Sequence, residues 1–154
     1  DFADNRIIPD CVRAAIASKP IVVRNPNSVR PYQHVLDPLY AYLMIAAAQY
    51  ENPALADYYN VGPNECDCLT TGQLATLFCE SWGNGQNYEV LSKDGPHEAN
   101  FLKLDCDKLK SVFSWQPRWS ASEAVRKTDE WTKVYAVGGD VPAKLDEQIN
   151  EFFA

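Results

Sequence analysis

Near the start of this chain, apolar positions with helical spacing are followed by a short β-branched run. Between residues 7 and 16 the apolar side chains recur every three or four positions, which predicts an amphipathic helix. Asp4 or Asn5 is expected to cap this helix, and Pro9 falls in its first turn, where a missing N–H does no harm. Three β-branched residues at 21–23 then predict a short strand.

The longest apolar run covers residues 39–48 and belongs to a predicted helix over residues 38–50. Asp37 is its expected N-cap, and Pro38 suits its first turn. The nearly continuous apolar character predicts that this helix is buried. The run is nevertheless too short to cross a bilayer, and no signal segment opens the chain. We therefore expect a soluble cytoplasmic protein without a membrane partner.

Short strands and helices alternate along the rest of the chain. Strands are predicted over residues 58–63, 88–90 and 102–104, and helices over 72–82, 107–113, 120–137 and 142–154. The expected caps are Thr70 or Thr71, then Asp105, then Ser120. The strands are too few and too short for a complete doubly wound sheet. The pattern indicates a helix-rich, incomplete α/β structure.

Composition and charge limit the ligands that such a chain can take. It has 154 residues, 46% of them hydrophobic, which suits one globular domain or one lobe of a larger protein. The net charge of −7 argues against nucleic acid as a partner. Residues 1–30 differ, because they hold five basic and three acidic groups. That local excess fits a small anion better than a duplex.

The five cysteines do not indicate a metal site or a disulfide framework. Cys66 and Cys68 are separated by one residue, with no second pair and no histidine nearby. A zinc site would need a fuller set of ligands. We expect no bound metal, and reduced thiols typical of the cytosol.

The most informative stretch follows the first predicted strand. Arg24 and Arg30 bracket a turn, Tyr32 and His34 come next, and no further Lys or Arg occurs until Lys93. Guanidinium groups bind two oxygens of a phosphate at once. With an aromatic ring and an imidazole beside them, they suit an anion that carries rings or hydroxyls.

Several short segments together point to a known family. In chain order they are NRIIPD (5–10), RNP (24–26), VRPYQHVLDPL (29–39), YNVGP (59–63), PHEA (96–99), LD (104–105) and WQPRW (115–119). As an ordered set they resemble the C-terminal part of the CDP-glucose 4,6-dehydratases. These enzymes are NAD-dependent lyases of the extended short-chain dehydrogenase/reductase superfamily, and the resemblance covers the whole chain.

The resemblance implies that residues 1–154 form one helix-rich substrate-binding lobe, without the N-terminal Rossmann domain that binds most of the NAD. The chain has no glycine-rich turn after a strand and no Tyr-x-x-x-Lys motif. We therefore expect a fragment-like chain with no catalytic residue of its own, inactive in isolation. The intact family is expected to form homo-oligomers.

The family's reaction would be the work of the whole enzyme. The resemblance implies that the sugar of CDP-glucose is oxidised at C4 by bound NAD, loses water across C5 and C6, and regains the hydride at C6. The product, CDP-4-keto-6-deoxyglucose, would serve lipopolysaccharide O-antigen biosynthesis. Two alternatives remain: a non-catalytic nucleotide-sugar-binding remnant, and a related NAD-dependent epimerase or dehydratase that uses another nucleotide.

The resemblance also assigns roles to individual residues. Arg30 would grip the pyrophosphate, Val22 would cover the base, and Arg24 would meet the ribose or a phosphate. Arg6 and Ile7 would line the nucleotide pocket at the entry of the first helix. The alternatives are a solvated loop arginine for Arg30, a surface arginine for Arg24 and core packing for Ile7.

Three further residues are weaker candidates for substrate binding. His97 and Glu98 lie in a loop after Gly95-Pro96, which the resemblance places over the nucleotide, although a plain loop is the alternative. Asn64 follows a Gly-Pro turn. His34 is expected to be a buried, hydrogen-bonded histidine rather than a ligand to the substrate.

Overall fold

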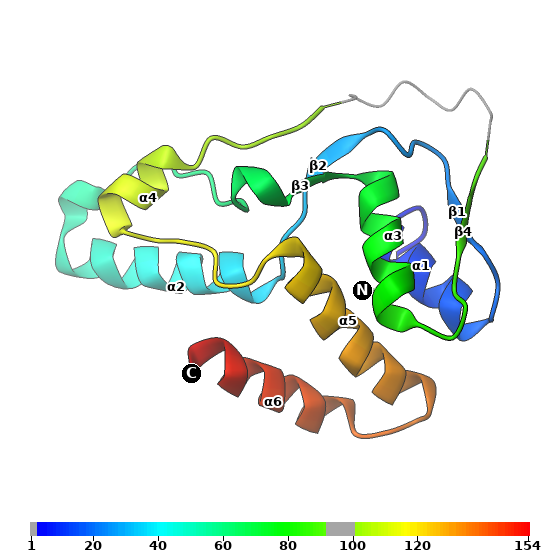
Figure 1. Ribbon diagram of the computed structural model, residues 1–154. Coiled ribbons are helices and arrows are strands. Elements are labelled where there is room, and N and C mark those ends of the chain that lie inside the picture. Colours follow the sequence, from blue (N-terminus) through cyan, green and yellow to red (C-terminus); the bar gives the residue numbers. More distant parts are fainter. Residues whose placement is uncertain (1–2, 92–100) are drawn as a thin grey trace.

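The computed structural model describes residues 3–91 and 101–154, and helices make up most of it (Figure 1). The elements, in chain order, are α1 (Ile7–Ile16), β1 (Ile21–Val23), β2 (Val29–Pro31), α2 (Leu36–Glu51), η1 (Pro53–Leu55), η2 (Glu65–Asp67), β3 (Cys68–Thr70), α3 (Thr71–Trp82), β4 (Tyr88–Val90), α4 (Asp107–Phe113), α5 (Ala121–Ala136) and α6 (Val141–Phe153). The predicted helix-rich α/β class with few short strands is confirmed. No helix of the described ranges is long and apolar enough to cross a membrane.

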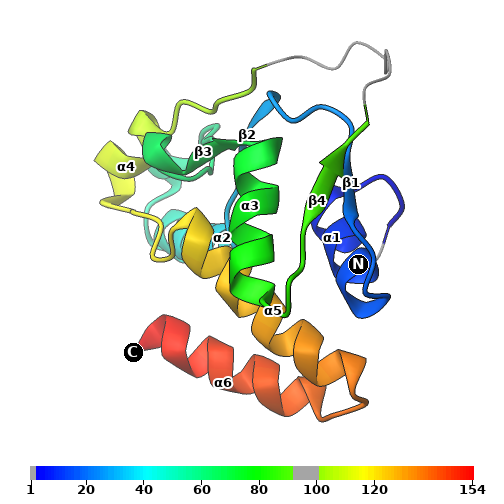
Figure 2. The same ribbon diagram turned by 45° about the vertical axis from the view of Figure 1, so that its right-hand side comes forward.

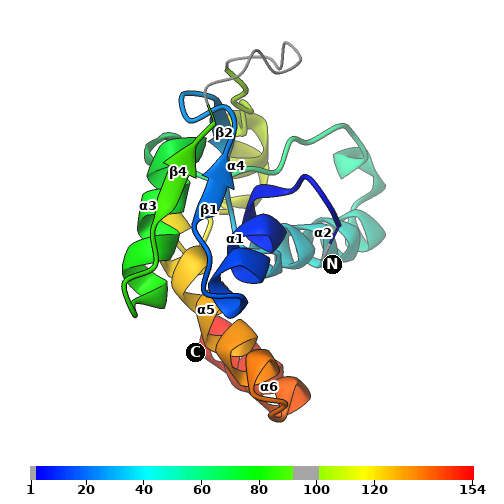
Figure 3. The same ribbon diagram turned by 90° about the vertical axis from the view of Figure 1, so that its right-hand side faces the viewer.

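The strands form two small sheets. β1 and β4 pair in parallel, with Ile21 opposite Tyr88, and they lie side by side between α1 and α3 (Figure 3). β2 and β3 pair antiparallel, with Arg30 opposite Leu69. Neither β2 nor β3 was expected, because a proline ends the first segment and the second runs directly into the cap of α3.

The first core lies where α1, β1, α3 and α5 meet (Figure 2). It contains Cys11, Val12, Ala15, Ile21, Val23, Leu74, Ala75, Phe78 and Val125. β1 turns Ile21 and Val23 inward and leaves Val22 exposed, as expected for a strand with one buried face. This core therefore fixes the direction in which Val22 projects.

A second core joins α2 to α4 and to the segment before α5. Ala41, Leu109 and Trp115 are its buried members. Phe152 of α6 packs against Tyr40 and Trp119, with ring centroids 6.1 and 5.1 Å apart. α6 thereby holds the start of α2 and the start of α5 together.

The predicted burial of α2 is wrong for this chain. Only Asp37 and Ala41 of the helix are buried. Its opposite face shows an apolar stripe to solvent, of Leu39, Tyr42, Leu43, Ala46, Ala47 and Tyr50, with Leu43 70% exposed. We call this the α2 stripe. An uncharged helix face of this length is typical of an element that packs on another surface.

Two predicted strands are also absent. Residues 58–63 form no ladder, and Tyr58 is almost fully exposed. Residues 102–104 are likewise irregular, and only Phe101 makes an isolated bridge to Val29. A strand needs a hydrogen-bonding neighbour, which the described part of the chain does not supply to residues 58–63.

The helix caps were partly predictable. The expected cap at Thr70 or Thr71 is Thr70, whose hydroxyl accepts from the amide of Gln73; the side-chain oxygen of Gln73 accepts in turn from the amide of Thr70, which completes a capping box. Neither Asp4 nor Asn5 caps α1, where the N-cap is Arg6. Asp37 is not a cap either, because it lies inside α2, fully buried, and accepts from the amide of Arg118 at 2.7 Å. The bond joins residues 81 positions apart.

Asp129 on α5 makes the fold sensitive to pH. The side chain is buried, and burial raises its pKa from 3.8 to about 6, because Ser81 and Lys133 offset the loss of hydration only in part. The folded state therefore binds more protons than the unfolded state between those values. The free energy of unfolding should fall as pH rises through that window and stay lower above it.

Asp129→Asn should remove this penalty. At pH 7 we expect a gain in the free energy of unfolding of up to about 3 kcal/mol, since one pKa unit corresponds to about 1.4 kcal/mol. At pH 4 the gain should nearly vanish, because Asp129 is then protonated in the folded state. Urea denaturation at both pH values checks this, and equal gains at both would contradict it.

Candidate functional site

Five of the residues singled out in the sequence line one pocket. Arg6, Ile7, Val22, Arg24 and Arg30 surround a cavity of about 420 Å³. We call it the arginine pocket. Its size falls within the range of small-molecule sites. Ile7 also packs against the first core, so it serves both as core and as lining. Binding by these residues stays a prediction, but their common location is a feature of the fold.

The lining of the arginine pocket comes from the start of α1, from β1 and the residues after it, from β2, and from the start of α3. Arg6 and Ile7 stand at the N-terminal end of α1, Val22 projects from the exposed face of β1, and Arg24 directly follows that strand. Arg30 is the middle residue of β2. The pairing of β2 with β3 turns this short strand toward the start of α3, whose first residue also lines the pocket.

The loop that carries the arginines is fixed to the start of α3. The amide of Gly72 donates to the carbonyl of Pro26 at 2.8 Å, and that of Thr71 to the carbonyl of Ser28 at 2.9 Å. A Cβ at residue 72 would lie 3.2 Å from the carbonyl oxygen of Pro26, so glycine permits this close approach. These two amides of α3 are therefore not available to an anion in the pocket.

The electrostatics of the arginine pocket favour an anion. Three guanidinium groups line it, together with one carboxylate, that of Asp10. Asp10 forms an ion pair with Arg13, which is not part of the lining, so its charge is largely offset from outside. Arg24 donates to the amide oxygen of Asn5 at 2.7 Å, and Arg30 donates to the carbonyl of Val29 at 2.9 Å.

Sequence reasoning missed several lining residues. They are Asn5, Asp10, Val23, Asn25, Pro31, Tyr32 and Thr71, although Tyr32 had been noted beside the arginines. Asp10 could have been predicted, because it lies four positions after the candidate Arg6, and residues four apart share a helix face. Thr71 could not, because it reaches the pocket through the contact between its helix and the loop. Its hydroxyl lies 3.3 Å from that of Tyr32.

The remaining predicted residues lie elsewhere. Asn64 stands at the start of η2, outside the arginine pocket, and accepts from Lys110 Nζ at 2.9 Å. His97 and Glu98 fall outside the described residues. His34 packs edge-on against Trp119 at 4.7 Å, and burial and Lys127 lower its pKa to about 4. A neutral, enclosed imidazole agrees with the structural role expected for it.

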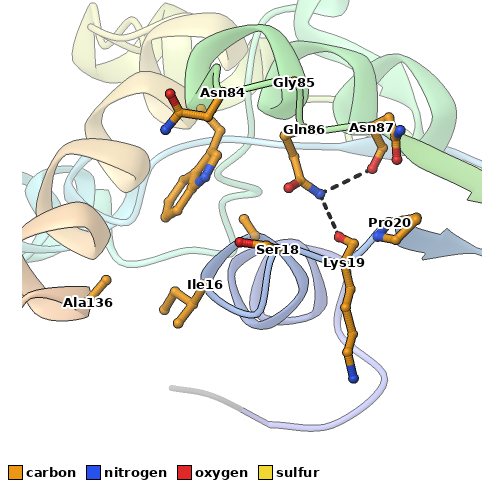
Figure 4. A pocket seen from close by; sticks show the side chains of 11 residues that line it. Ile16, Ser18, Lys19, Pro20, Asn84, Gly85, Gln86, Asn87 and Ala136 are labelled. Atoms are coloured by element: carbon orange, nitrogen blue, oxygen red, sulfur yellow. Dashed lines mark hydrogen bonds between the residues drawn. The ribbon is translucent and has the colours of Figure 1, made fainter.

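A second hollow, of about 380 Å³, lies at the other end of α1 (Figure 4). Its walls include Ile16, Ser18, Lys19 and Pro20 on one side and Asn84–Asn87 on the other, and Gln86 joins them by donating to the carbonyl of Lys19 at 2.9 Å. Among the described residues, Lys19 is the only cationic residue that lines it. The arginine pocket is therefore the better anion site. Across the described ranges, no group of three His, Cys, Asp or Glu residues could hold a metal ion.

Comparison with known proteins relates the chain to enzymes that act on nucleotide sugars. No protein-family model matches it. It is homologous over its full length to CDP-glucose 4,6-dehydratase of Salmonella typhimurium, with 32% identity over 155 positions. The chain spans 43% of that protein's length. Over that part the chain is similar to a nucleotide-sugar dehydratase, in line with the resemblance that the motifs indicated.

Solved structures show the same fold in nucleotide-sugar epimerases. UDP-glucuronic acid 4-epimerase from Bacillus cereus, in complex with UDP-glucuronic acid and NAD, has a TM-score of 0.71 at 14% identity. UDP-N-acetylglucosamine 4-epimerase from the same organism has a TM-score of 0.70 at 17% identity. The matches cover 85% and 86% of this chain, but only 40% and 44% of the epimerases. The chain thus shares the fold of part of these two epimerases.

Proposed function

We propose that residues 1–154 are the substrate-binding lobe of a CDP-glucose 4,6-dehydratase, and that the arginine pocket binds CDP-glucose. The carrying observation is that Arg6, Arg24 and Arg30 converge on one cavity of a chain homologous to such an enzyme. The chain would bind and orient the nucleotide. Remote binding of this kind helps to align the sugar for reaction.

The lining of the arginine pocket supports a diphosphate flanked by a nucleoside. Guanidinium groups hold phosphate oxygens in pairs, and two or three of them can share a diphosphate. The exposed side chain of Val22 and the phenol of Tyr32 offer apolar area for a base or a sugar ring. The hydroxyls of Tyr32 and Thr71 can exchange hydrogen bonds with ribose or hexose.

NAD would bind mainly to a separate Rossmann domain. A dinucleotide site needs a glycine-rich turn between a strand and a helix, and this sequence has none. Oxidation, elimination of water and return of the hydride would accordingly require that second domain. CDP-glucose binding by this chain does not depend on it, which makes the proposal testable on the chain itself.

The α2 stripe supports the proposal that this is one lobe of a larger enzyme. An apolar helix face exposed over about three turns is costly in water, and residues 58–63 lack a strand partner among the described residues. The edge of a sheet in another domain could pair with such a strand-like segment, and the helix before it could pack on the face of that sheet. We infer that the α2 stripe packs against the NAD-binding domain.

Leu43→Lys tests this role of the α2 stripe. The chain alone should self-associate through its uncovered stripe at high concentration, and the charge should abolish this. The free energy of unfolding should change by less than about 0.5 kcal/mol, because the side chain is exposed. Val137→Lys makes the same change at an exposed site away from α2. If sedimentation equilibrium showed equal effects of both variants, or a monomeric wild type, the docking role would be wrong.

A second candidate ligand is a UDP-sugar, because two epimerases with the same fold carry UDP-sugar names. Calorimetric titration with CDP-glucose and with UDP-glucose decides between them. We expect tighter binding of CDP-glucose, weakened by added salt as charge-based contacts are. Preference for UDP-glucose would favour the second candidate, and no binding of either would contradict the proposed function.

A further inference from the structure

Asn5 was expected only as one of two possible helix caps. It has an unusual backbone conformation and lines the arginine pocket. Its φ is 61°, in the left-handed region, directly before the N-cap residue of α1. Residues with a Cβ rarely adopt this conformation, and asparagine is among those that tolerate it best. Asn5 does not cap the helix, so a helix cap is not the reason for this conformation.

The side chain of Asn5 is instead bonded to an arginine of the pocket. Its amide oxygen accepts from Arg24 Nη1 at 2.7 Å, across 19 positions of sequence. Both residues line the arginine pocket. The bond joins the segment before α1 to the segment after β1 and limits the positions open to the guanidinium group.

An amide suits this position better than the alternatives. A carboxylate would also accept from Arg24, but its charge would offset the positive charge that an anion requires. Glycine would fit the backbone with less strain but would offer no acceptor. Asparagine combines the left-handed conformation with a neutral acceptor, so that Arg24 is held while its charge remains available.

We propose that Asn5 is a positioning residue, which holds Arg24 in place before the ligand arrives. The proposal rests on the proposed function, since it makes Arg24 part of the nucleotide-sugar site. An exposed arginine loses rotamer freedom when a ligand orders it, and prior ordering reduces that loss. Asn5 thus raises affinity without touching the phosphates itself.

Asn5→Gly removes the acceptor and keeps the backbone. We expect calorimetry to show a dissociation constant for CDP-glucose that is about three- to tenfold higher, with an unchanged or higher melting temperature. Asn84→Gly is the matched control, because Asn84 has φ of 54° and lies outside the arginine pocket. That control should leave the affinity unchanged.

Two further measurements separate positioning from a general effect. In an Arg24→Ala background, Asn5→Gly should cause no additional loss of affinity, and an additive loss would overturn the proposal. NMR of the arginine side chains in the ligand-free chain should show that the Arg24 guanidinium becomes more mobile in Asn5→Gly. Unchanged mobility would overturn the positioning role, whereas lack of CDP-glucose binding by the wild type would overturn the proposed function alone.

Discussion

Arg30→Ala should weaken CDP-glucose binding about 10- to 150-fold and leave the melting temperature nearly unchanged. Hydrogen bonds to charged groups contribute roughly 1.5–3 kcal/mol, and each 1.4 kcal/mol is about tenfold in affinity. Arg30 is half-buried at the middle of β2, where partial exclusion of water strengthens a phosphate contact. Calorimetric titration measures the affinity and thermal unfolding the stability.

Two companion variants show whether charge or geometry matters at Arg30. Arg30→Lys keeps the charge but loses the planar fork, so it should fall between the wild type and Arg30→Ala. Arg126→Ala removes an arginine of α5 that pairs with Glu123 and Glu130, outside the arginine pocket, and should not change the affinity. Equal affinities for the wild type and Arg30→Ala would refute the phosphate role.

Phe152→Ala should lower the free energy of unfolding by about 3–5 kcal/mol, as deletion of a buried aromatic ring does. The side chain is buried, and the Arg118 guanidinium lies 5.3 Å from its ring centroid. Because Phe152 contacts both Tyr40 and Trp119, its loss should loosen α6 and the start of α2 together.

Phe153→Ala is the control for Phe152→Ala. The same residue type stands one position later on α6 and is 54% exposed, so its removal should cost much less. Urea denaturation followed by circular dichroism gives both values. Similar losses for the two variants would mean that α6 does not hold the starts of α2 and α5 together in the way described.

Local signals in the sequence predicted the helices, and contacts between distant segments explain where prediction failed. The cap at Thr70 involves residues three apart, so the sequence offered it, with Thr71 as the alternative. Asp37 precedes a proline and therefore suggested a cap, but its partner is the amide of Arg118. No local pattern contains that contact.

The errors at α2 and at residues 58–63 have one physical cause. An apolar helix and a strand-like segment both suggest a neighbouring surface, and the prediction assumed that this surface lies within the chain. The part of the chain that the structure describes covers neither Leu43 nor Tyr58. The pattern therefore identified surfaces that need a partner, rather than surfaces already covered.

The candidate site was predictable in composition but not in geometry. The resemblance singled out Arg6, Arg24 and Arg30, and the fold places all three around one cavity. The partner of Arg24 was not foreseen, since Asn5 was expected only as one of two possible caps of the first helix. Its contact depends on how α1 packs beside β1, which no spacing in the sequence expresses.

Mapping CDP-glucose onto the chain by NMR tests directly whether the arginine pocket binds the nucleotide sugar. Backbone amide signals should be followed during titration of the wild-type chain with CDP-glucose. We expect the largest shifts around the arginine pocket, at Ile7, Val23, Arg30 and Thr71. Shifts confined to the hollow at Asn84–Asn87, or none at millimolar ligand, would contradict it.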